Sequence, residues 1–575
     1  MSRVTTAAAV IGAVGTIGAV AVAVVGPRET VELMETLFSD PVRELRDEPP
    51  LPSPQRPRVL LIALDGVGYE SLREALESGA LPRLGAALGP PRGDGVFEHA
   101  YSVPNVLSIL PSTTVAAWTT AFTGVGVAEH GVSGNEQFDR TSGRFYAPAP
   151  VSVTSVADMM ATFNDGLVGS MIQSPTLFEQ LPGRRCHVSL GHVHRGVAVF
   201  TAPTGLAFEP IFSAFVRGAL EDEPEGTQLE GAKGLDRGSV ESLLEAVDEH
   251  GVPDLQVAYF PGIDLHTHVA RHALESQQDY LAEVIDPVVG ALIDRWREEG
   301  AWPSTWLVVT ADHGHTPVLN DDRHSLGPEG ADEPPAVLER LGFTMRPLQV
   351  GVADGSYSAA IAYQGAMAYV YLADRSSCDP TCDWTRPPRL EEDVLRVAEG
   401  FYRASAEGKY VPAMKGTLDL VLARASPPAG ETANDFRVFD GQRLVDSDDF
   451  LQAHPRPKLL RLRERLHRLA AGPHGHLAGD VLLMARSGGD LPIEDRFYFS
   501  GPYHSWHGSP KASDSHIPVL VAHPSRSATD IRPRVIRLLG PAEGGWHSQR
   551  GLTPLVVGLM RSDHAAPDEQ RRGAD

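Results

Sequence analysis

The sequence predicts an α/β fold with a mostly parallel central sheet that is flanked by helices and interrupted by cap-like insertions. Three observations support this prediction. Uninterrupted apolar runs of strand length recur along the chain, amphipathic segments of helix length lie between them, and the runs end abruptly in polar residues. An uninterrupted apolar run indicates a strand that is buried on both faces, as in parallel sheets. Alternation with helices indicates the crossover connections that parallel strands need.

The predicted elements follow one another from residue 58 onward. The first strand, Val59–Leu64, stops at Asp65-Gly66 and is followed by the amphipathic segment YESLREALESG, in which Gly79 marks the helix end. The segments SLLEAVDEH and QDYLAEVIDPVVGALIDRWREEG have the same helical pattern and precede later strands. These further predicted strands are residues 255–260, 305–310 and 516–522.

Two stretches break the alternation, at about residues 140–240 and 320–480. Both are irregular and rich in Gly and Pro, so we interpret them as insertions that cover the end of the sheet and shape a substrate pocket. In open sheets of this kind, ligands bind beyond the carboxyl ends of the strands. The predicted folded domain spans residues 58–560, and residues 561–575 form a polar tail.

The N-terminal segment has the pattern of an export signal. Residues 4–26 contain no charge, follow Arg3 and are mostly Ala, Gly and Val. We interpret residues 1–26 as a cleaved signal peptide or an uncleaved membrane anchor, with a buried Ala/Gly-rich helix as the remaining alternative. Residues 27–57 are predicted to be a Pro-rich linker. Either of the first two interpretations predicts an extracytoplasmic or membrane-anchored location.

Charge and cysteine content narrow the class of protein. A formal net charge of -24 argues against a nucleic-acid-binding protein, which needs clustered Lys and Arg. Cys378 and Cys382 could close a local disulfide or remain free thiols, and the predicted export favours the disulfide. The sequence is silent on the oligomeric state.

Carboxylates and imidazoles follow the predicted strands. Asp264 and His268, in DLHTH, stand four residues apart, so both project from one face of a helical turn and can hold the same ion. Asp312 and His313, in TADHGHT, are adjacent and diverge unless the turn after the strand redirects them. Asp65 supplies another carboxylate at the same sheet edge. We therefore predict a metal site at this edge, against the alternative of polar loops that cap the strands.

A late histidine, two hydroxyls and an amide complete the candidate set. In GPYHSWHGSPKASDSHIPVLV we prefer His507, which precedes the last strand by a short loop, and keep His504 as the alternative. In ILPSTTVAAWTTAFTG, Thr113 and Thr114 stand before a helix-like stretch, where a hydroxyl serves as an N-cap or meets a bound anion. Asn135, in AEHGVSGNE, has an amide that can donate to a phosphate oxygen.

Taken in order, these motifs resemble the alkaline phosphatase superfamily, and within it the type I phosphodiesterase/nucleotide pyrophosphatase group. The motifs are LIALDG, PSTT followed by TG and EHGVSGN, DLHTH, TADHGHT and the late HG, spread over roughly residues 58 to 525. The resemblance implies an alkaline phosphatase-like catalytic domain and a hydrolase of phosphate esters. It also implies a small-molecule phosphate ester as the substrate.

The resemblance further implies a site for two Zn²⁺ ions, whose ligands suit Mn²⁺ or Mg²⁺ less well. Thr114 would be the nucleophile, and Asn135 would bind a phosphate oxygen. The metal ligands would form two sets: Asp65, Asp312, His313 and Thr114 for one ion, and Asp264, His268 and His507 for the other.

Departures from the family pattern limit what the resemblance implies. Val115, Ala116 and Ala117 stand where nucleotide phosphodiesterases usually have Phe-Pro-Asn, which leaves nucleotide specificity open. Thr267 stands where the second metal motif usually has a glycine, and Thr113 remains an alternative nucleophile. The alternative functions are a phosphomonoesterase or phosphonate hydrolase of the same superfamily, and a metal-binding protein that has lost catalysis.

Overall fold

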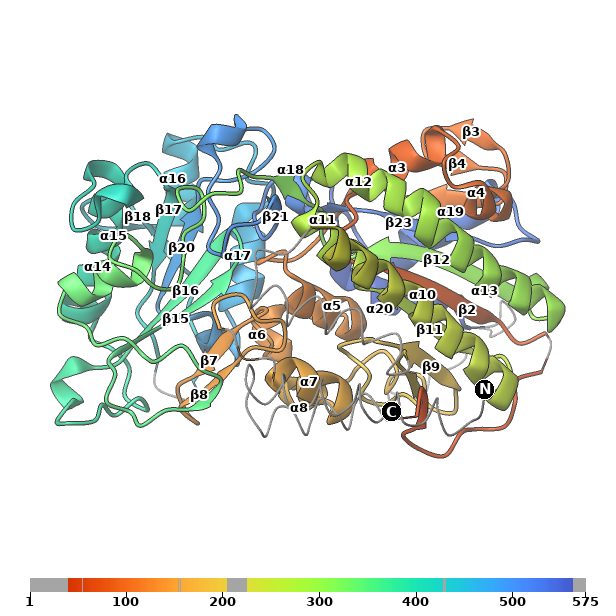
Figure 1. Cartoon of the computed structure of the whole chain (residues 1–575), viewed down its shortest axis with the longest axis horizontal. Coiled ribbons are helices and arrows are strands. Elements are labelled where there is room, and N and C mark those ends of the chain that lie inside the picture. Colours follow the sequence, from red (N-terminus) through yellow and green to blue (C-terminus); the bar gives the residue numbers. More distant parts are fainter. Residues whose placement is uncertain are drawn as a thin grey trace, which may run out of the picture.

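The computed structural model describes residues 40–53, 55–153, 155, 157–203, 225–427 and 431–561. The predicted export segment and the tail beyond residue 561 lie outside these ranges, so the extracytoplasmic location stays a prediction. Within the described ranges, no helix is both long and apolar enough to cross a membrane. Figure 1 shows two lobes, each built around its own sheet.

The larger sheet has the predicted strands at its centre. Its strand order is β1-β10-β9-β11-β2-β12-β23-β5-β4-β3. β11, β2 and β12 are parallel neighbours, as predicted, whereas β23 is antiparallel to β12. The strands are β1 (Val42–Glu44), β2 (Arg58–Leu64), β3 (Pro91–Gly93), β4 (Val96–Phe97), β5 (Ala100–Ser102), β9 (Cys186–Ser189), β10 (Val199–Thr201), β11 (Leu255–Phe260), β12 (Thr305–Ala311) and β23 (Val519–Ala522).

Helices cover both faces of this sheet (Figure 1). Side chains alternate along β2, so that Leu60 and Ile62 face one helical layer and Val59 and Leu61 face the other. Every residue of β2 and β12 is buried, which explains their uninterrupted apolar runs. The first layer contains α3 (Tyr69–Glu77), α4 (Pro82–Leu88), α10 (Glu225–His250), α12 (Ala273–Tyr280) and α13 (Asp286–Glu298). The second contains α5 (Thr114–Thr123), α8 (Leu167–Met171), α19 (Ala528–Leu539) and α20 (Leu552–Leu559).

The smaller sheet forms the core of the second lobe, on the left in Figure 1. Its order is β15-β16-β20-β17-β18-β19, and neighbouring strands are antiparallel. The strands are β15 (Ala359–Gln364), β16 (Met367–Leu372), β17 (Leu418–Ala423), β18 (Arg437–Phe439), β19 (Leu444–Val445) and β20 (Val481–Ala485). α14 (Pro334–Arg340) and α15 (Arg396–Glu407) pack on one face, and α17 (Leu462–Ala470) packs on the other.

The structure corrects the interpretation of the two irregular stretches. The stretch 320–480 contains most of the smaller sheet, and the stretch 140–240 supplies β9 and β10 to the larger sheet. The sequence AAIAYQGAMAYVYL forms the hairpin β15–β16, in which every strand residue is buried. Ala and Tyr dominate this hairpin, so it lacks the runs of β-branched residues that mark strands most clearly.

Short elements surround the two sheets. The additional strands are β6 (Val106–Leu107), β7 (Gln137–Asp139), β8 (Arg144–Tyr146), β13 (Thr316–Pro317), β14 (Gly351–Val352), β21 (Ser505–Trp506), β22 (His516–Ile517) and β24 (His547–Ser548). The additional α-helices are α6 (Val127–His130), α7 (Ala157–Asn164), α11 (Gly262–Val269), α16 (Ser447–Ala453) and α18 (Ala512–Ser515). Short π and 3-10 turns are Leu281–Ile285, Trp302–Ser304, Arg375–Ser377, Leu390–Leu395, Pro412–Met414, Gly475–Ala478, Ile493–Asp495, Gln549–Gly551.

Two further features bear on the sequence predictions. Cys378 and Cys382 form the disulfide, and Cys186 is a buried free thiol.

Part of the expected linker packs on the larger sheet, because β1 pairs with β10 at the sheet edge. Glu48, which follows β1, contacts His187 of β9 with 2.6 Å between Oε1 and Nε2.

A buried carboxyl group, Asp236 of α10, fixes the start of α11. Its Oδ1 accepts a hydrogen bond from the Gly262 N–H at 2.8 Å, and its Oδ2 lies 2.9 Å from the Tyr280 hydroxyl. That hydroxyl also donates to the Ala232 carbonyl at 2.8 Å. Since a hydroxyl has one proton, both contacts of Tyr280 are satisfied only if Asp236 is protonated and donates to it. Burial raises the pKa of Asp236 to about 7, in agreement with a neutral carboxyl group.

We expect Asp236→Asn to remove part of the pH dependence of the unfolding free energy. Because folding raises the pKa of Asp236 from 3.8 to about 7, the folded state binds an extra proton between these values. The stabilisation by this proton is fully present below pH 3.8 and is lost as the pH rises through 7. Asn mimics the neutral carboxyl group and does not ionise. The free energy of unfolding of the variant, relative to that of wild type, should therefore increase by roughly 2–3 kcal/mol from about pH 5 to about pH 8. Denaturant titrations at both pH values check this, and a pH-independent difference contradicts it.

Candidate active site

The predicted site residues come together at the carboxyl ends of β2, β11 and β12. Each of these strands is followed by acidic residues or histidines, either directly or on the next helix. The rings of His313 and His507 stack with centroids 3.5 Å apart and join two groups of side chains. The structure buries all eight predicted residues: Asp65, Thr114, Asn135, Asp264, His268, Asp312, His313 and His507.

The first group consists of Asp65, Asp312 and His313, which could hold a metal ion. His313 Nε2 lies 3.4 Å from Asp65 Oδ1 and 3.3 Å from Asp312 Oδ2. Both of these carboxylate oxygens are buried and have no hydrogen-bond partner among the described residues. Asp312 Oδ1 accepts from the N–H groups of Gly66 and His313, at 3.1 and 3.0 Å. The turn after β12 thus directs two adjacent side chains to one point.

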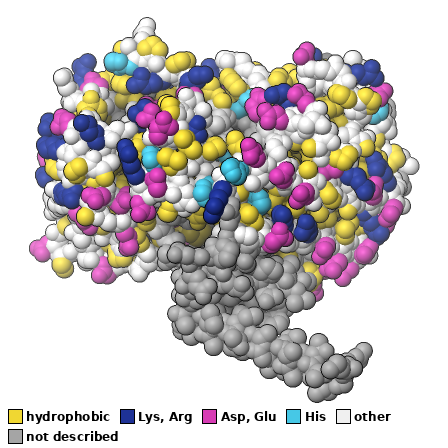
Figure 2. Space-filling model, turned by 45° about the horizontal axis from the view of Figure 1, so that its top comes forward, with side chains coloured by type: hydrophobic (Ala, Val, Ile, Leu, Met, Phe, Trp, Pro, Cys, Tyr) yellow, Lys and Arg dark blue, Asp and Glu magenta, His cyan; other side chains and the backbone are white. Residues whose placement is uncertain are grey.

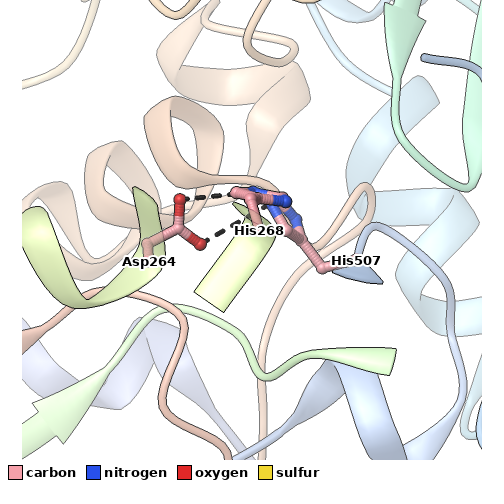
Figure 3. Close-up of side chains that lie close together, drawn as sticks. All are labelled: Asp264, His268 and His507. Atoms are coloured by element: carbon pink, nitrogen blue, oxygen red, sulfur yellow. Dashed lines mark ion pairs between the residues drawn. The ribbon is translucent and has the colours of Figure 1, made fainter. Parts of the chain in front are cut away.

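The second group consists of Asp264, His268 and His507. His268 Nε2 lies 3.3 Å from Asp264 Oδ2, and His507 Nε2 lies 3.9 Å from Asp264 Oδ1. Figure 3 shows the Asp264 carboxylate facing both rings. Asp264 and His268 share one face of α11, so the predicted four-residue spacing on a helical turn is confirmed.

The three histidines direct their Nε2 atoms toward the carboxylates. In His268, His313 and His507, Nδ1 lies 2.7, 3.1 and 2.9 Å from a backbone carbonyl oxygen. These acceptors belong to Ser505, Gly314 and Ser112, respectively. Because a carbonyl only accepts, Nδ1 carries a proton in each ring, so Nε2 is the atom that can present a lone pair to a cation. Three such Nε2 atoms beside buried carboxylate oxygens form a donor set that fits metal ions.

The electrostatics of the carboxylates lead to the same conclusion. Burial, together with the charges of Asp312 and Asp264, raises the pKa of Asp65 well above its usual range. Burial also raises the pKa of Asp312 to about 6. For Asp264, burial acts in the same direction, but His268 and His315 outweigh it and hold its pKa well below its usual range. Divalent cations would keep Asp65 and Asp312 ionised as well.

The N-terminus of α5 presents a hydroxyl to the first group. Thr114 Oγ1 lies 3.3 Å from His313 Nε2. Thr113 is the N-cap residue of α5, and its buried hydroxyl has no hydrogen-bond partner in the described part of the chain. Asn135 Oδ1 accepts from the Val115 N–H at 3.0 Å, which leaves its Nδ2 to donate to an anion beside Thr114. Thr114, and not Thr113, is thus the hydroxyl within hydrogen-bond distance of the first group.

Two polar side chains that the sequence analysis did not assign hold the carboxylates in place. His315 Nε2 lies 2.8 Å from Asp264 Oδ1, and its Nδ1 lies 3.0 Å from Ser505 Oγ. The Tyr259 hydroxyl donates to Asp65 Oδ2. TADHGHT contains His315, and LQVAYF contains Tyr259, but neither pattern says which carboxylate each would meet.

The turn after β2 requires glycine. Gly66 has a φ of 69°, and a Cβ there would lie 2.6 Å from His315 Nε2 and 2.7 Å from Asp264 Oδ1. The Asp-Gly pair that the sequence marks as a turn thus also makes room for the contact between His315 and Asp264.

The remaining histidines near the site have other contacts. His504, the alternative to His507, contacts Asn320, with 3.0 Å between Nε2 and Nδ2. His266, between the two α11 ligands, packs against the Tyr280 ring with centroids 4.8 Å apart. The preference for His507 is therefore consistent with the geometry.

The buried carboxylate and imidazole groups could hold metal ions beside the Thr114 hydroxyl, an arrangement that suits metal-dependent hydrolysis of an ester. Residues 59–328 match the family described as type I phosphodiesterase / nucleotide pyrophosphatase. Curated protein sequences gave no match.

Solved structures of low sequence identity are similar along most of the chain. Human ectonucleotide pyrophosphatase / phosphodiesterase 5 has a TM-score of 0.48 and 14% identity, over 88% of this chain and 94% of that chain. The inactive murine protein of the same name, in complex with AMP, has a TM-score of 0.45 and 14% identity, over 88% and 95%. Phosphonoacetate hydrolase from Sinorhizobium meliloti 1021, in complex with phosphonoformate, has a TM-score of 0.45 and 16% identity, over 90% and 98%.

Proposed function

We propose that the chain is a zinc-dependent phosphodiesterase of the nucleotide pyrophosphatase type that acts through Thr114. The observation that carries the proposal is the 3.3 Å contact between Thr114 Oγ1 and His313 Nε2, beside the unpartnered oxygens of Asp65 and Asp312. A hydroxyl beside cation-binding atoms is activated, because its deprotonated form is stabilised there.

The residues present fit two cations. One would be held by Asp65, Asp312, His313 and Thr114, and the other by Asp264, His268 and His507. Neutral imidazoles combined with carboxylates suit Zn²⁺, whereas Mg²⁺ prefers oxygen ligands. When bound, the ions would supply positive charge near the attacking and leaving oxygens.

The chain's own residues account for the two steps of the reaction. In the first, Thr114 Oγ releases its proton to solvent and bonds to phosphorus, while the bond from phosphorus to the leaving oxygen breaks and that oxygen takes up a proton from solvent. In the second, water hydrolyses phospho-Thr114, which restores the hydroxyl and releases the phosphorylated product. Asn135 would donate from Nδ2 to a non-bridging oxygen, and the N-terminus of α5 adds partial positive charge beside the phosphate.

The match of residues 59–328 to the type I phosphodiesterase / nucleotide pyrophosphatase family supports a phosphodiester substrate over a phosphomonoester. On the face in Figure 2, Lys and Arg are interspersed with Asp and Glu, which agrees with a small-molecule substrate rather than a nucleic acid.

The test compares hydrolysis of bis-p-nitrophenyl phosphate and p-nitrophenyl phosphate by the purified protein. We expect turnover of the diester to be faster, to be lost on chelation and to return with zinc. Faster hydrolysis of the monoester would make the protein a phosphomonoesterase, and hydrolysis of phosphonoacetate alone would make it a phosphonate hydrolase. Metal binding without turnover of any of the three would contradict the proposed function.

A further inference from the structure

The turn between β15 and β16 lies where the smaller sheet meets the active site. It consists of Gln364, Gly365 and Ala366, and it contacts two segments of the site. One segment contains Asn135, which would bind the phosphate. The other contains His507, which would bind a metal ion. The turn belongs to neither segment and to neither group of metal ligands.

The side chain of Gln364 clamps the backbone around Asn135. Gln364 Oε1 accepts a hydrogen bond from the Asn135 N–H at 2.8 Å, and Gln364 Nε2 donates to the Glu136 carbonyl oxygen at 2.5 Å. Gln364 is fully buried. A Cβ on residue 134 would lie 1.9 Å from Gln364 Oε1, so Gly134 is required for this close approach.

The clamp leaves the Asn135 amide little freedom. Its Oδ1 is bound by the Val115 N–H of α5 at 3.0 Å, while its backbone is bound by Gln364. The next side chain, the buried Glu136, accepts from the N–H groups of Val151 and Ser152 at 2.8 and 2.6 Å. With the backbone and Oδ1 both fixed, Nδ2 has one direction in which to donate.

The same turn supports His507 through the backbone. The Ala366 N–H donates to the His507 carbonyl oxygen at 2.9 Å. Gly365 has a φ of 65°, and a Cβ there would lie 2.2 Å from that oxygen. Gly508 has a φ of 112°, and a Cβ there would lie 2.3 Å from the Gln364 carbonyl oxygen. Glycines on both sides thus allow two backbones to pack directly against each other.

We propose that Gln364 is a positioning residue, through which the smaller sheet sets the orientation of the phosphate-binding amide of Asn135. The proposal rests on the proposed function in one respect, namely that Asn135 binds a phosphoryl oxygen. It makes the second lobe part of the catalytic unit rather than only a cover for the substrate. Gln364 itself touches neither the reacting atoms nor a metal ligand.

The test is a double-mutant cycle of Gln364→Leu and Asn135→Ala in the zinc-loaded full chain, with bis-p-nitrophenyl phosphate as substrate. We expect Asn135→Ala to lower kcat about 10²-fold and Gln364→Leu about 10-fold, both with a smaller effect on KM. If Gln364 acts through Asn135, the double variant loses no more activity than Asn135→Ala alone. Additive losses would overturn the proposal.

A second readout does not depend on turnover. The affinity for inorganic phosphate, measured by calorimetry, should fall in both single variants and no further in the double variant. Phosphate binding that is unchanged in Gln364→Leu overturns the positioning role. Absence of diester hydrolysis by wild type contradicts the proposed function instead, and the phosphate cycle still decides the role of Gln364.

The matched control is Tyr371→Phe, which removes a buried hydrogen bond on the same hairpin. Tyr371 donates from its hydroxyl to the Leu477 carbonyl at 2.6 Å. We expect the control to keep kcat and phosphate affinity within about twofold, although it loses about 1 kcal/mol of stability. An equal loss of kcat in the control would show a general effect of the lobe and overturn the proposal. If Gln364→Leu does not fold, Gln364→Glu replaces it, because it keeps an acceptor for Asn135 and loses the donor to Glu136.

Discussion

Replacement of Thr114 by alanine is expected to abolish phosphodiester turnover and to leave the metal content nearly unchanged. Thr114 Oγ1 lies 3.3 Å from His313 Nε2, at the start of a helix whose N–H groups favour an anion. The carboxylates and imidazoles of both metal-binding groups are intact in this variant. Loss of the nucleophile should lower kcat by about 10⁴-fold or more. Turnover assays combined with metal analysis of the purified variant check both expectations.

Thr113→Ala is the matched control. The Thr113 hydroxyl has no hydrogen-bond partner in the described chain, so kcat should stay within about threefold of wild type. Acid quenching during turnover should trap phosphate on Thr114, which peptide mass spectrometry detects. Activity retained in Thr114→Ala would move the nucleophile to Thr113 if that control is inactive, and to a water molecule if both variants are active.

The carboxylates and imidazoles of the candidate site could be selected from the sequence because their positions follow from local rules. Asp65 and Asp312 stand directly after buried strands, and parallel neighbours bring their carboxyl ends to the same edge. Asp264 and His268 share a helix face through their spacing. The choice of His507 over His504 rested on its place before the last strand, and the distance of 3.9 Å to Asp264 agrees with it.

The supporting residues could not be predicted in the same way, since their partners lie far away in the sequence. His315 meets Asp264 across 51 positions, and Gln364 meets Asn135 across 229. Tyr259 sits in a strand where an aromatic side chain is ordinary core, yet its hydroxyl reaches Asp65 across 194 positions. Only the fold decides such contacts.

The second lobe shows a different limit of sequence analysis. The strands β15 and β16 consist largely of Ala, Tyr and Met, and all of their residues are buried, so they show neither alternation nor β-branched runs. The strands pair across long separations, such as β16 with β20 and β17 with β20. A stretch that resembled a loop-rich insertion is therefore an ordered sheet that reaches the active site through its β15–β16 turn.

Asp312→Asn is expected to remove both turnover and metal from the first group. The substitution keeps the side-chain shape and the Oδ1 contacts with the N–H groups of Gly66 and His313. It replaces the unpartnered Oδ2, 3.3 Å from His313 Nε2, with an NH₂ group. An amide that donates to Nε2 occupies the lone pair that a cation needs, so kcat should fall by about 10³-fold or more. Metal analysis and diester assays check the result.

The same change should stabilise the metal-free protein. Burial raises the pKa of Asp312 to about 6, and its charge helps to raise the pKa of Asp65, so the ionised pair opposes folding when no cation is present. In chelator the free energy of unfolding of the variant should therefore exceed that of wild type by about 1–2 kcal/mol, and its unfolding temperature should be higher. Zinc should reverse this order. Asp286→Asn, at a buried carboxylate that accepts from the N–H groups of Arg83 and Leu84, is the control and should leave zinc content unchanged. If Asp312→Asn kept its zinc and its turnover, the first metal-binding group would be assigned to the wrong residues. Reversal of the stability order by zinc is expected only if the repulsion between these carboxylates is relieved by a bound cation.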